Sequence, residues 1–134
     1  MQAALTAYLL ADAELSALVG NRIHWGRLPA SVTGRPYINL QVVSAPGKYH
    51  FGGRSNYNQT RVQVDIWAET ASAALIVQKV LRALIEARRF QQGQIKFQGV
   101  FFDGGRDLTD DTAGDERPLF GKTIDLRIHW TEEP

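Results

Sequence analysis

The chain has 134 residues, 44% hydrophobic and 22% charged, a composition typical of a soluble globular protein with one apolar core. Fifteen basic and 14 acidic side chains leave a formal net charge of +1, so we expect no overall attraction to nucleic acid or anionic lipid. The absence of cysteine excludes disulfides and thiolate metal sites. No apolar run approaches the roughly 20 residues that span a bilayer, and no basic region typical of a secretory signal opens the chain. We therefore expect one domain over residues 1–134 and no membrane partner.

The first residues predict helix followed by irregular chain. Ala3–Leu10 is rich in strong helix formers, and Asp12 can cap a second short turn that ends at Gly20. Arg22–Trp25 has the character of a short strand. Prolines and glycines keep residues 26–36 irregular.

Two segments in the middle of the chain alternate apolar and polar residues, as half-buried strands do. They are Tyr37–Ser44 and Arg61–Ala68, which we expect to be antiparallel neighbours. Alternation places Trp67 on the wet face of the second strand, where a large aromatic side chain often marks an interface. A local bulge that turns Trp67 inward is the alternative.

Thr70–Ala87 predicts the longest helix, capped by Thr70 or Ser72. Its apolar side chains recur at the spacing of one helix face, at Ala74, Val77, Val80, Leu81, Leu84 and Ile85.

Two further strands are predicted after this helix. In Gln94–Asp103 the inward residues are Ile95 and Phe97, followed by Gly99 or Phe101. In the second strand, Leu119–Thr131, the apolar face consists of Ile124, Leu126, Ile128 and Trp130. Together the elements predict an α+β fold. It has a mostly antiparallel sheet of about four strands, two helices packed on one face, and two long projecting loops, Pro46–Asn58 and Gly104–Pro118.

No residue pattern indicates a catalytic centre. The three histidines form no local metal motif, and the two glycine pairs match no phosphate-binding loop. The acidic stretch 103–116 lacks the calcium-loop pattern, so we interpret it as a solvated loop or a protein-docking loop. An enzyme would have to gather at least two of Asp103, Asp107 and Asp110 in one pocket. We expect no cofactor and no metal.

The loop Pro46–Asn58 mixes aromatic and basic residues. Such a mixture can anchor a protein interface, in which Tyr and Arg are enriched, or stack nucleic-acid bases. Only Lys48 and Arg54 carry a permanent positive charge here, which is little for a phosphate track. Protein contact is the favoured interpretation. The alternatives are a hairpin without an energetic role and a nucleic-acid-binding α+β module that uses loop 46–58.

Several short strings follow one another along nearly the whole chain. They are Leu9–Ile23, Arg27–Pro29, Pro36–Ile38, Arg61–Ala68, Ala74–Leu84, Gly99–Asp103 with Arg106 and Asp107, and a closing alternating strand that ends in Trp130. In this order they resemble the small tail-completion proteins of long-tailed phages, prophages and gene transfer agents. That family lies within a broader set that includes tail terminators of the lambda type.

The resemblance implies a structural role in virion assembly and no enzyme activity. Such relatives form a ring, typically a hexamer, that caps the finished tail tube, stops its polymerisation and mediates head–tail joining. The implied partners are further copies of the chain, the tail tube protein and the head–tail connector protein. DNA is implied only as it passes through the lumen. The implied location is the virion tail or neck, after assembly in the bacterial host cytoplasm.

Contacts between subunits or with the tube would then involve the two polar loops and their flanking strands. The candidate interface residues are Lys48, Tyr49, Phe51, Arg54, Tyr57, Arg61, Trp67, Arg106, Asp107, Asp110 and Asp111. A ring requires one patch of a subunit to meet a different patch of the next. We therefore expect Arg54 or Arg61 of one subunit to face Asp110 or Asp111 of its neighbour, which would favour specificity and fast encounter.

Overall fold

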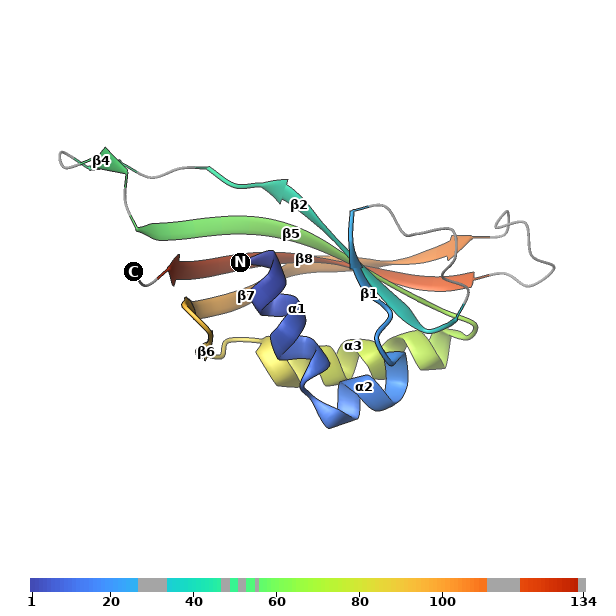
Figure 1. The fold of residues 1–134 in the computed structure, drawn as a ribbon. Coiled ribbons are helices and arrows are strands. Elements are labelled where there is room, and N and C mark those ends of the chain that lie inside the picture. Colours follow the sequence, from blue (N-terminus) through green and yellow to red (C-terminus); the bar gives the residue numbers. More distant parts are fainter. Residues whose placement is uncertain (27–33, 47–48, 51–52, 55, 111–118, 133–134) are drawn as a thin grey trace.

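The computed structural model describes residues 1–26, 34–46, 49–50, 53–54, 56–110 and 119–132, and Figure 1 shows how their elements are arranged. In chain order the elements are α1 (Gln2–Leu10), α2 (Ala13–Val19), β1 (Ile23–Trp25), β2 (Tyr37–Ser44), β3 (Tyr49–His50), β4 (Gly53–Arg54), β5 (Tyr57–Ala68), α3 (Ala71–Ile85), β6 (Phe90–Gln92), β7 (Ile95–Asp110) and β8 (Leu119–Glu132).

Within these residues, six strands form one curled sheet in the order β1-β2-β5-β8-β7-β6. β1 runs parallel to β2, and the other neighbouring pairs are antiparallel. The α+β fold and the antiparallel pairing of β2 with β5 are confirmed, but the predicted number of about four strands is wrong. Of the two additional edge strands, β1 lies within the expected strand Arg22–Trp25. β6 has only three residues, so an alternating pattern could not identify it as a strand.

Three helices are described, rather than the two that the sequence predicted. The turn expected after Asp12 is a separate helix, α2, in which the Leu15 N–H donates to Asp12 Oδ2 at 2.9 Å. Gly20 ends this helix with a φ of +59°. Thr70 caps α3 as predicted, because its Oγ1 accepts a hydrogen bond from the Ala73 N–H at 3.1 Å. None of the helices in the described residues is long and apolar enough to cross a lipid bilayer.

The core lies between the helices and one face of the sheet (Figure 1). The predicted stripe of α3 is buried at Ala74, Val77, Leu81 and Ile85. The two central strands contribute alternate residues, among them Val62, Val64, Ile66, Ile124, Leu126 and Ile128. Trp130 packs at the margin of this core and its Nε1–H donates to Thr60 Oγ1 at 3.0 Å, which confirms its predicted direction.

β7 contains two bulges, one at Gln98 and one at Asp103. The first brings Val100 into the core and turns Phe101 outward, where 42% of its surface is exposed. The prediction that Gly99 or Phe101 points inward is therefore wrong. An extra residue on one strand reverses the alternation beyond it.

The glycine pair that the sequence placed at the start of a loop instead continues β7. Gly104 has a φ of +151°, a conformation that favours glycine, and directly follows the second bulge. A Cβ on Gly105 would lie 2.9 Å from the carbonyl oxygen of Thr123, so the close approach of β8 requires a glycine there. β7 consequently runs to Asp110, and the predicted loop is wrong up to that residue.

The remainder of that loop, 111–118, lies outside the described residues. The other predicted loop, Pro46–Asn58, contains an antiparallel two-stranded sheet made by β3 and β4, and the first residues of β5. In Figure 1, β4 stands well away from the six-stranded sheet, so this strand projects.

Candidate functional site on the open face of the sheet

The sheet face opposite the helices, here called the open face, carries alternate residues of the long strands. On β5 these include Arg61, Gln63, Asp65 and Trp67; on β8 they include Thr123, Asp125, Arg127 and His129. This is the half of β8 that the sequence predicted to be wet. The candidate residues Tyr57, Arg61 and Trp67 all lie here.

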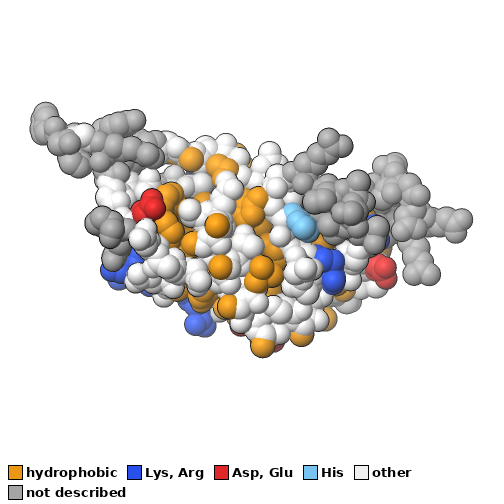
Figure 2. Space-filling model, viewed as in Figure 1, with side chains coloured by type: hydrophobic (Ala, Val, Ile, Leu, Met, Phe, Trp, Pro, Cys, Tyr) orange, Lys and Arg blue, Asp and Glu red, His pale blue; other side chains and the backbone are white. Residues whose placement is uncertain are grey.

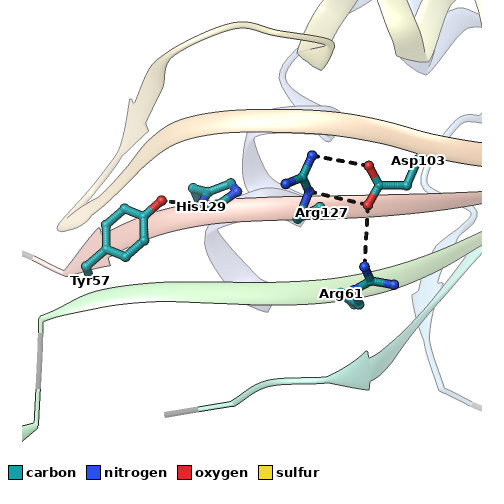
Figure 3. Close-up of polar contacts among 5 residues, drawn as sticks. All are labelled: Tyr57, Arg61, Asp103, Arg127 and His129. Carbon is teal, nitrogen blue, oxygen red and sulfur yellow. Dashed lines mark hydrogen bonds and ion pairs between the residues drawn. The ribbon is translucent and has the colours of Figure 1, made fainter. Parts of the chain in front are cut away.

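Asp103 is the electrostatic centre of the open face (Figure 3). Arg61 of β5 and Arg127 of β8 are directly opposite each other in the strand register. The bulge in β7 places the Asp103 carboxylate beside both, with Oδ2 3.3 Å from Arg127 Nε and 3.9 Å from Arg61 Nη2. Like charges on directly opposite residues repel, so this carboxylate offsets a repulsion built into the sheet.

Aromatic rings continue the group toward one end of the strands. The Tyr57 hydroxyl forms a hydrogen bond with His129 Nδ1 (Figure 3). The Phe101 ring meets the His129 ring edge-on, with 5.6 Å between the ring centres. The guanidinium carbon of Arg127 lies 5.2 Å from the centre of the Phe101 ring. We call this set the open-face cluster; it consists of Tyr57, Arg61, Phe101, Asp103, Arg127 and His129. A half-exposed mixture of aromatic and arginine side chains is typical of protein interfaces.

Trp67 lies on the open face toward the other end of the sheet. Its register with β8 is unbroken, so the alternative of a bulge that turns it inward is wrong. The ring is half-buried because it packs over Gly121, where a Cβ would lie 2.8 Å from Trp67 Cε3. Nearby, Asp65 Oδ1 accepts a hydrogen bond from Thr123 Oγ1 at 2.7 Å.

The end of β7 forms a separate polar region. Asp107 pairs with Lys122 of β8 at 2.5 Å and leaves 82% of its own side chain exposed. Asp107 and Arg106 line a shallow hollow of about 320 Å³ beside α3, whereas Asp103 lines a different hollow, of about 220 Å³. Asp103 and Asp107, one of the carboxylate pairs that the enzyme alternative allowed, therefore line different hollows. Asp110 is the last residue of β7.

The remaining candidates lie in or near the β3–β4 hairpin. Tyr49 of β3 and Arg54 of β4 are partners in its backbone register. Lys48 and Phe51, like Asp111 after β7, lie outside the described residues. The candidates thus fall into three places: the hairpin, the open face and the end of β7.

Among the described residues, the ion pair of Arg82 and Glu86 on the outer surface of α3 clearly shifts the pKa of both groups. Arg82 donates two hydrogen bonds to Glu86, at 2.8 and 2.7 Å, which lower the pKa of Glu86 and raise that of Arg82. Since the Glu86 carboxylate is stabilised in the folded state, its contribution is present above the unfolded pKa and is lost as the pH falls through the folded value. Both side chains are well exposed, so the contribution is a few tenths of a kcal/mol.

The sequence did not single out Phe101, Asp103, Arg127 and His129 as contact residues. Alternation along β8 already placed Arg127 and His129 on the wet face, so a signal for these two was present. No local pattern indicated that Phe101 and Asp103 lie on this face, because their positions depend on the bulges of β7.

The model of the family described as tail completion protein gp17 matches residues 3–128 of the chain. The chain belongs to this family. As a member of this family, the chain is a structural protein of a phage-type tail. Among curated proteins, none matches its sequence.

Its fold is similar to that of a chain in a solved structure, the virion of a native gene transfer agent particle. The two share 16% sequence identity and superpose with a TM-score of 0.69, over 96% of this chain and 94% of the other. At this identity the likeness shows the fold alone. It extends over nearly the full length of both chains.

Proposed function

We propose that this tail completion protein is one subunit of a ring, which we expect to be hexameric, at the end of the tail tube. The ring stops tube polymerisation and mediates the joining of tail and head. The observation that carries this proposal is the family match from residue 3 to residue 128, which includes every described element apart from the first residue of α1 and the end of β8. We propose that residues 1–134 act as one domain, with no cofactor and no catalytic step.

The proposed partners are further copies of the chain, the tail tube protein and the head–tail connector protein, with DNA passing through the lumen. A closed ring larger than a dimer requires two different contact patches on each subunit. The hairpin and the start of β5 lie at one end of the sheet, whereas the end of β7 lies at the other (Figure 1). Figure 2, in the same view, likewise shows the charged side chains mainly toward the ends and hydrophobic atoms across the middle. Contacts at two opposite ends are suited to head-to-tail assembly.

The proposal can be tested by adding the purified protein to polymerising tail tube protein and imaging the tubes by negative-stain electron microscopy. We expect a ring-shaped density at one end of each tube and tubes that stop growing. Light scattering on the purified assembly would give the number of subunits. Bare tube ends and an unchanged distribution of tube lengths would contradict the proposal.

A further inference from the structure

The outer edge of β7 has few partners in the described part of the chain. β6 pairs only with Ile95–Phe97, and the Ala87 N–H donates to the Val100 carbonyl at 2.8 Å. Beyond that point, residues 101–110 pair with β8 on one side and with no other described strand. Residues 103–107 are all exposed. A long free edge of this kind is a template for another strand.

The direction of the free backbone groups follows from the bond to Val100. Its carbonyl points away from β8, and in an antiparallel strand the N–H and C=O of a residue point to the same side. The backbone N–H and C=O groups of every second residue therefore point away from β8, and the extra residue at the Asp103 bulge moves this alternation by one position. The residues with outward N–H and C=O groups are Phe102, Gly105, Asp107 and Thr109.

The opposite edge of the sheet is also incompletely covered. β1 pairs with β2 only over Ile38–Leu40, with the Ile38 N–H donating to the Arg22 carbonyl at 2.9 Å. By the same alternation Leu40 also points outward, where its carbonyl accepts from the Gly26 N–H at 2.7 Å, and Val42 is the first outward residue beyond the pairing with β1. It lies in the free segment 41–44, in which Val43 is 60% exposed.

The two edges have compatible directions. Three successive antiparallel pairings separate β2 from β7, so the two strands run antiparallel within one subunit. When the next subunit of a ring follows by a modest rotation, its β2 also runs antiparallel to the β7 that it meets. Antiparallel pairing forms well-aligned hydrogen bonds.

We propose that the free edge of β7, residues 101–110, receives residues 41–44 of β2 from a second copy. The sheets of neighbouring subunits then join through backbone hydrogen bonds, as in β-strand addition. This inference rests on the proposed ring and names the contact that builds it. The bulge at Asp103 and the charges of Arg106 and Asp107 limit indiscriminate pairing along the same edge.

Charge favours β2 over a second β7 as the occupant. Residues 101–110 contain three aspartates and one arginine, so pairing β7 with itself would bring like charges together. Residues 41–44, Gln-Val-Val-Ser, carry no charge. Pairing with this segment therefore brings no like charges together.

The test compares Asp107→Pro with Asp107→Ala. Both variants lose the ion pair with Lys122, but only proline removes the outward N–H, and edge strands tolerate proline when that N–H faces solvent. We expect Asp107→Pro to require a protein concentration about tenfold or more higher for assembly than Asp107→Ala does. The same contrast is expected between Val42→Ala and Val42→Pro. Circular dichroism checks that the proline variants fold.

A second measurement needs no variant. Amide hydrogen exchange in the assembled protein should slow by about tenfold or more at 101–110 and at 41–44, relative to the subunit at high dilution. Assembly of both proline variants, or unchanged exchange at both edges of an assembled ring, would overturn this contact while leaving the proposed function intact. A dimer with protection at β7 alone would indicate β7 self-pairing and overturn it too. Failure of the unmodified protein to assemble with or without tubes would overturn the proposed function, and this inference with it.

Discussion

On the open face, the carboxylate of Asp103 balances two positive charges that the strand register places opposite each other. Arg61 and Arg127 come from positions far apart in the sequence and meet because β5 pairs with β8. Their repulsion is offset by one carboxylate, which reaches them only because Asp103 occupies a bulge. Its ion pairs are partly exposed, so each contributes modestly.

Replacing Asp103 with Asn should lower the free energy of unfolding by about 1 kcal/mol, since two opposed arginines then lack their shared partner. The difference should shrink in 1 M salt, because salt screens the repulsion. Urea unfolding at low and high salt measures both effects. Asp125→Asn, on the same face and without an ion pair to the described residues, is the matched control. Equal destabilisation by the two variants would contradict the role assigned to Asp103.

A close contact on the same face gives a second prediction. Gly121→Ala should cost roughly 1–3 kcal/mol, because the new methyl group meets the Trp67 ring at 2.8 Å. In a Trp67→Leu background the same change should cost clearly less. Thermal or urea unfolding of the four proteins in this double-mutant cycle measures the coupling. An identical cost in both backgrounds would mean that Trp67 does not restrict position 121.

In β7, the alternation of apolar and polar residues predicts the wrong residues for the two faces of the strand. Its partner β8 keeps a regular pattern and provides backbone hydrogen bonds along its whole length. At each of two bulges, β7 has one residue more than β8 in their register. The glycine pair at 104–105 allows the second bulge to form against Thr123. The strand therefore changes which residues face the core partway along.

The change of faces along β7 can be tested with substitutions at two neighbouring residues. Val100→Ala should cost about 2 kcal/mol, because it removes fully buried methyl groups from the core. Phe101→Ala should cost roughly 0.5 kcal/mol or less, although it removes a larger side chain, since that ring lies on the open face. Urea unfolding compares the two directly. A larger cost at Phe101 would indicate that Phe101, rather than Val100, faces the core, as uninterrupted alternation predicts.

For the whole molecule, the polar segments lie at opposite ends of a long sheet (Figure 1). One end carries the hairpin with Arg54, and the other carries the last residues of β7. Arg61 is drawn into the open-face cluster by Asp103, which leaves Arg54 as the better basic candidate for a contact between subunits. Complementary charges at two ends of a subunit fit a head-to-tail ring.

Charge reversal tests that contact. We expect Arg54→Asp and Asp110→Arg each to slow ring assembly, and the double variant to restore it, because the pair is re-formed with its signs exchanged. Light scattering during assembly gives the rates. Lys79→Asp, a reversal on the exposed surface of α3, should leave them unchanged. If the double variant assembles no faster than the single ones, these two residues do not pair.

The sequence alone was enough to place the segments that depend on local patterns. Period-2 alternation located β2 and β8, helical spacing located α3, and the side chains of Asp12 and Thr70 marked helix starts that the structure confirms. The ordered strings along the chain were enough to predict the family.

Only the tertiary structure decided the register, the bulges and the edges. Tyr57 meets His129, and Arg61 meets Asp103, across separations that no local pattern encodes. The bulges arise where β7 must match β8, so they depend on the partner strand as well as on the residues of β7. The free edges likewise result from how far β1 and β6 extend. Local propensity acts within a segment, whereas these features depend on hydrogen bonds between segments, which exist only once the sheet has formed.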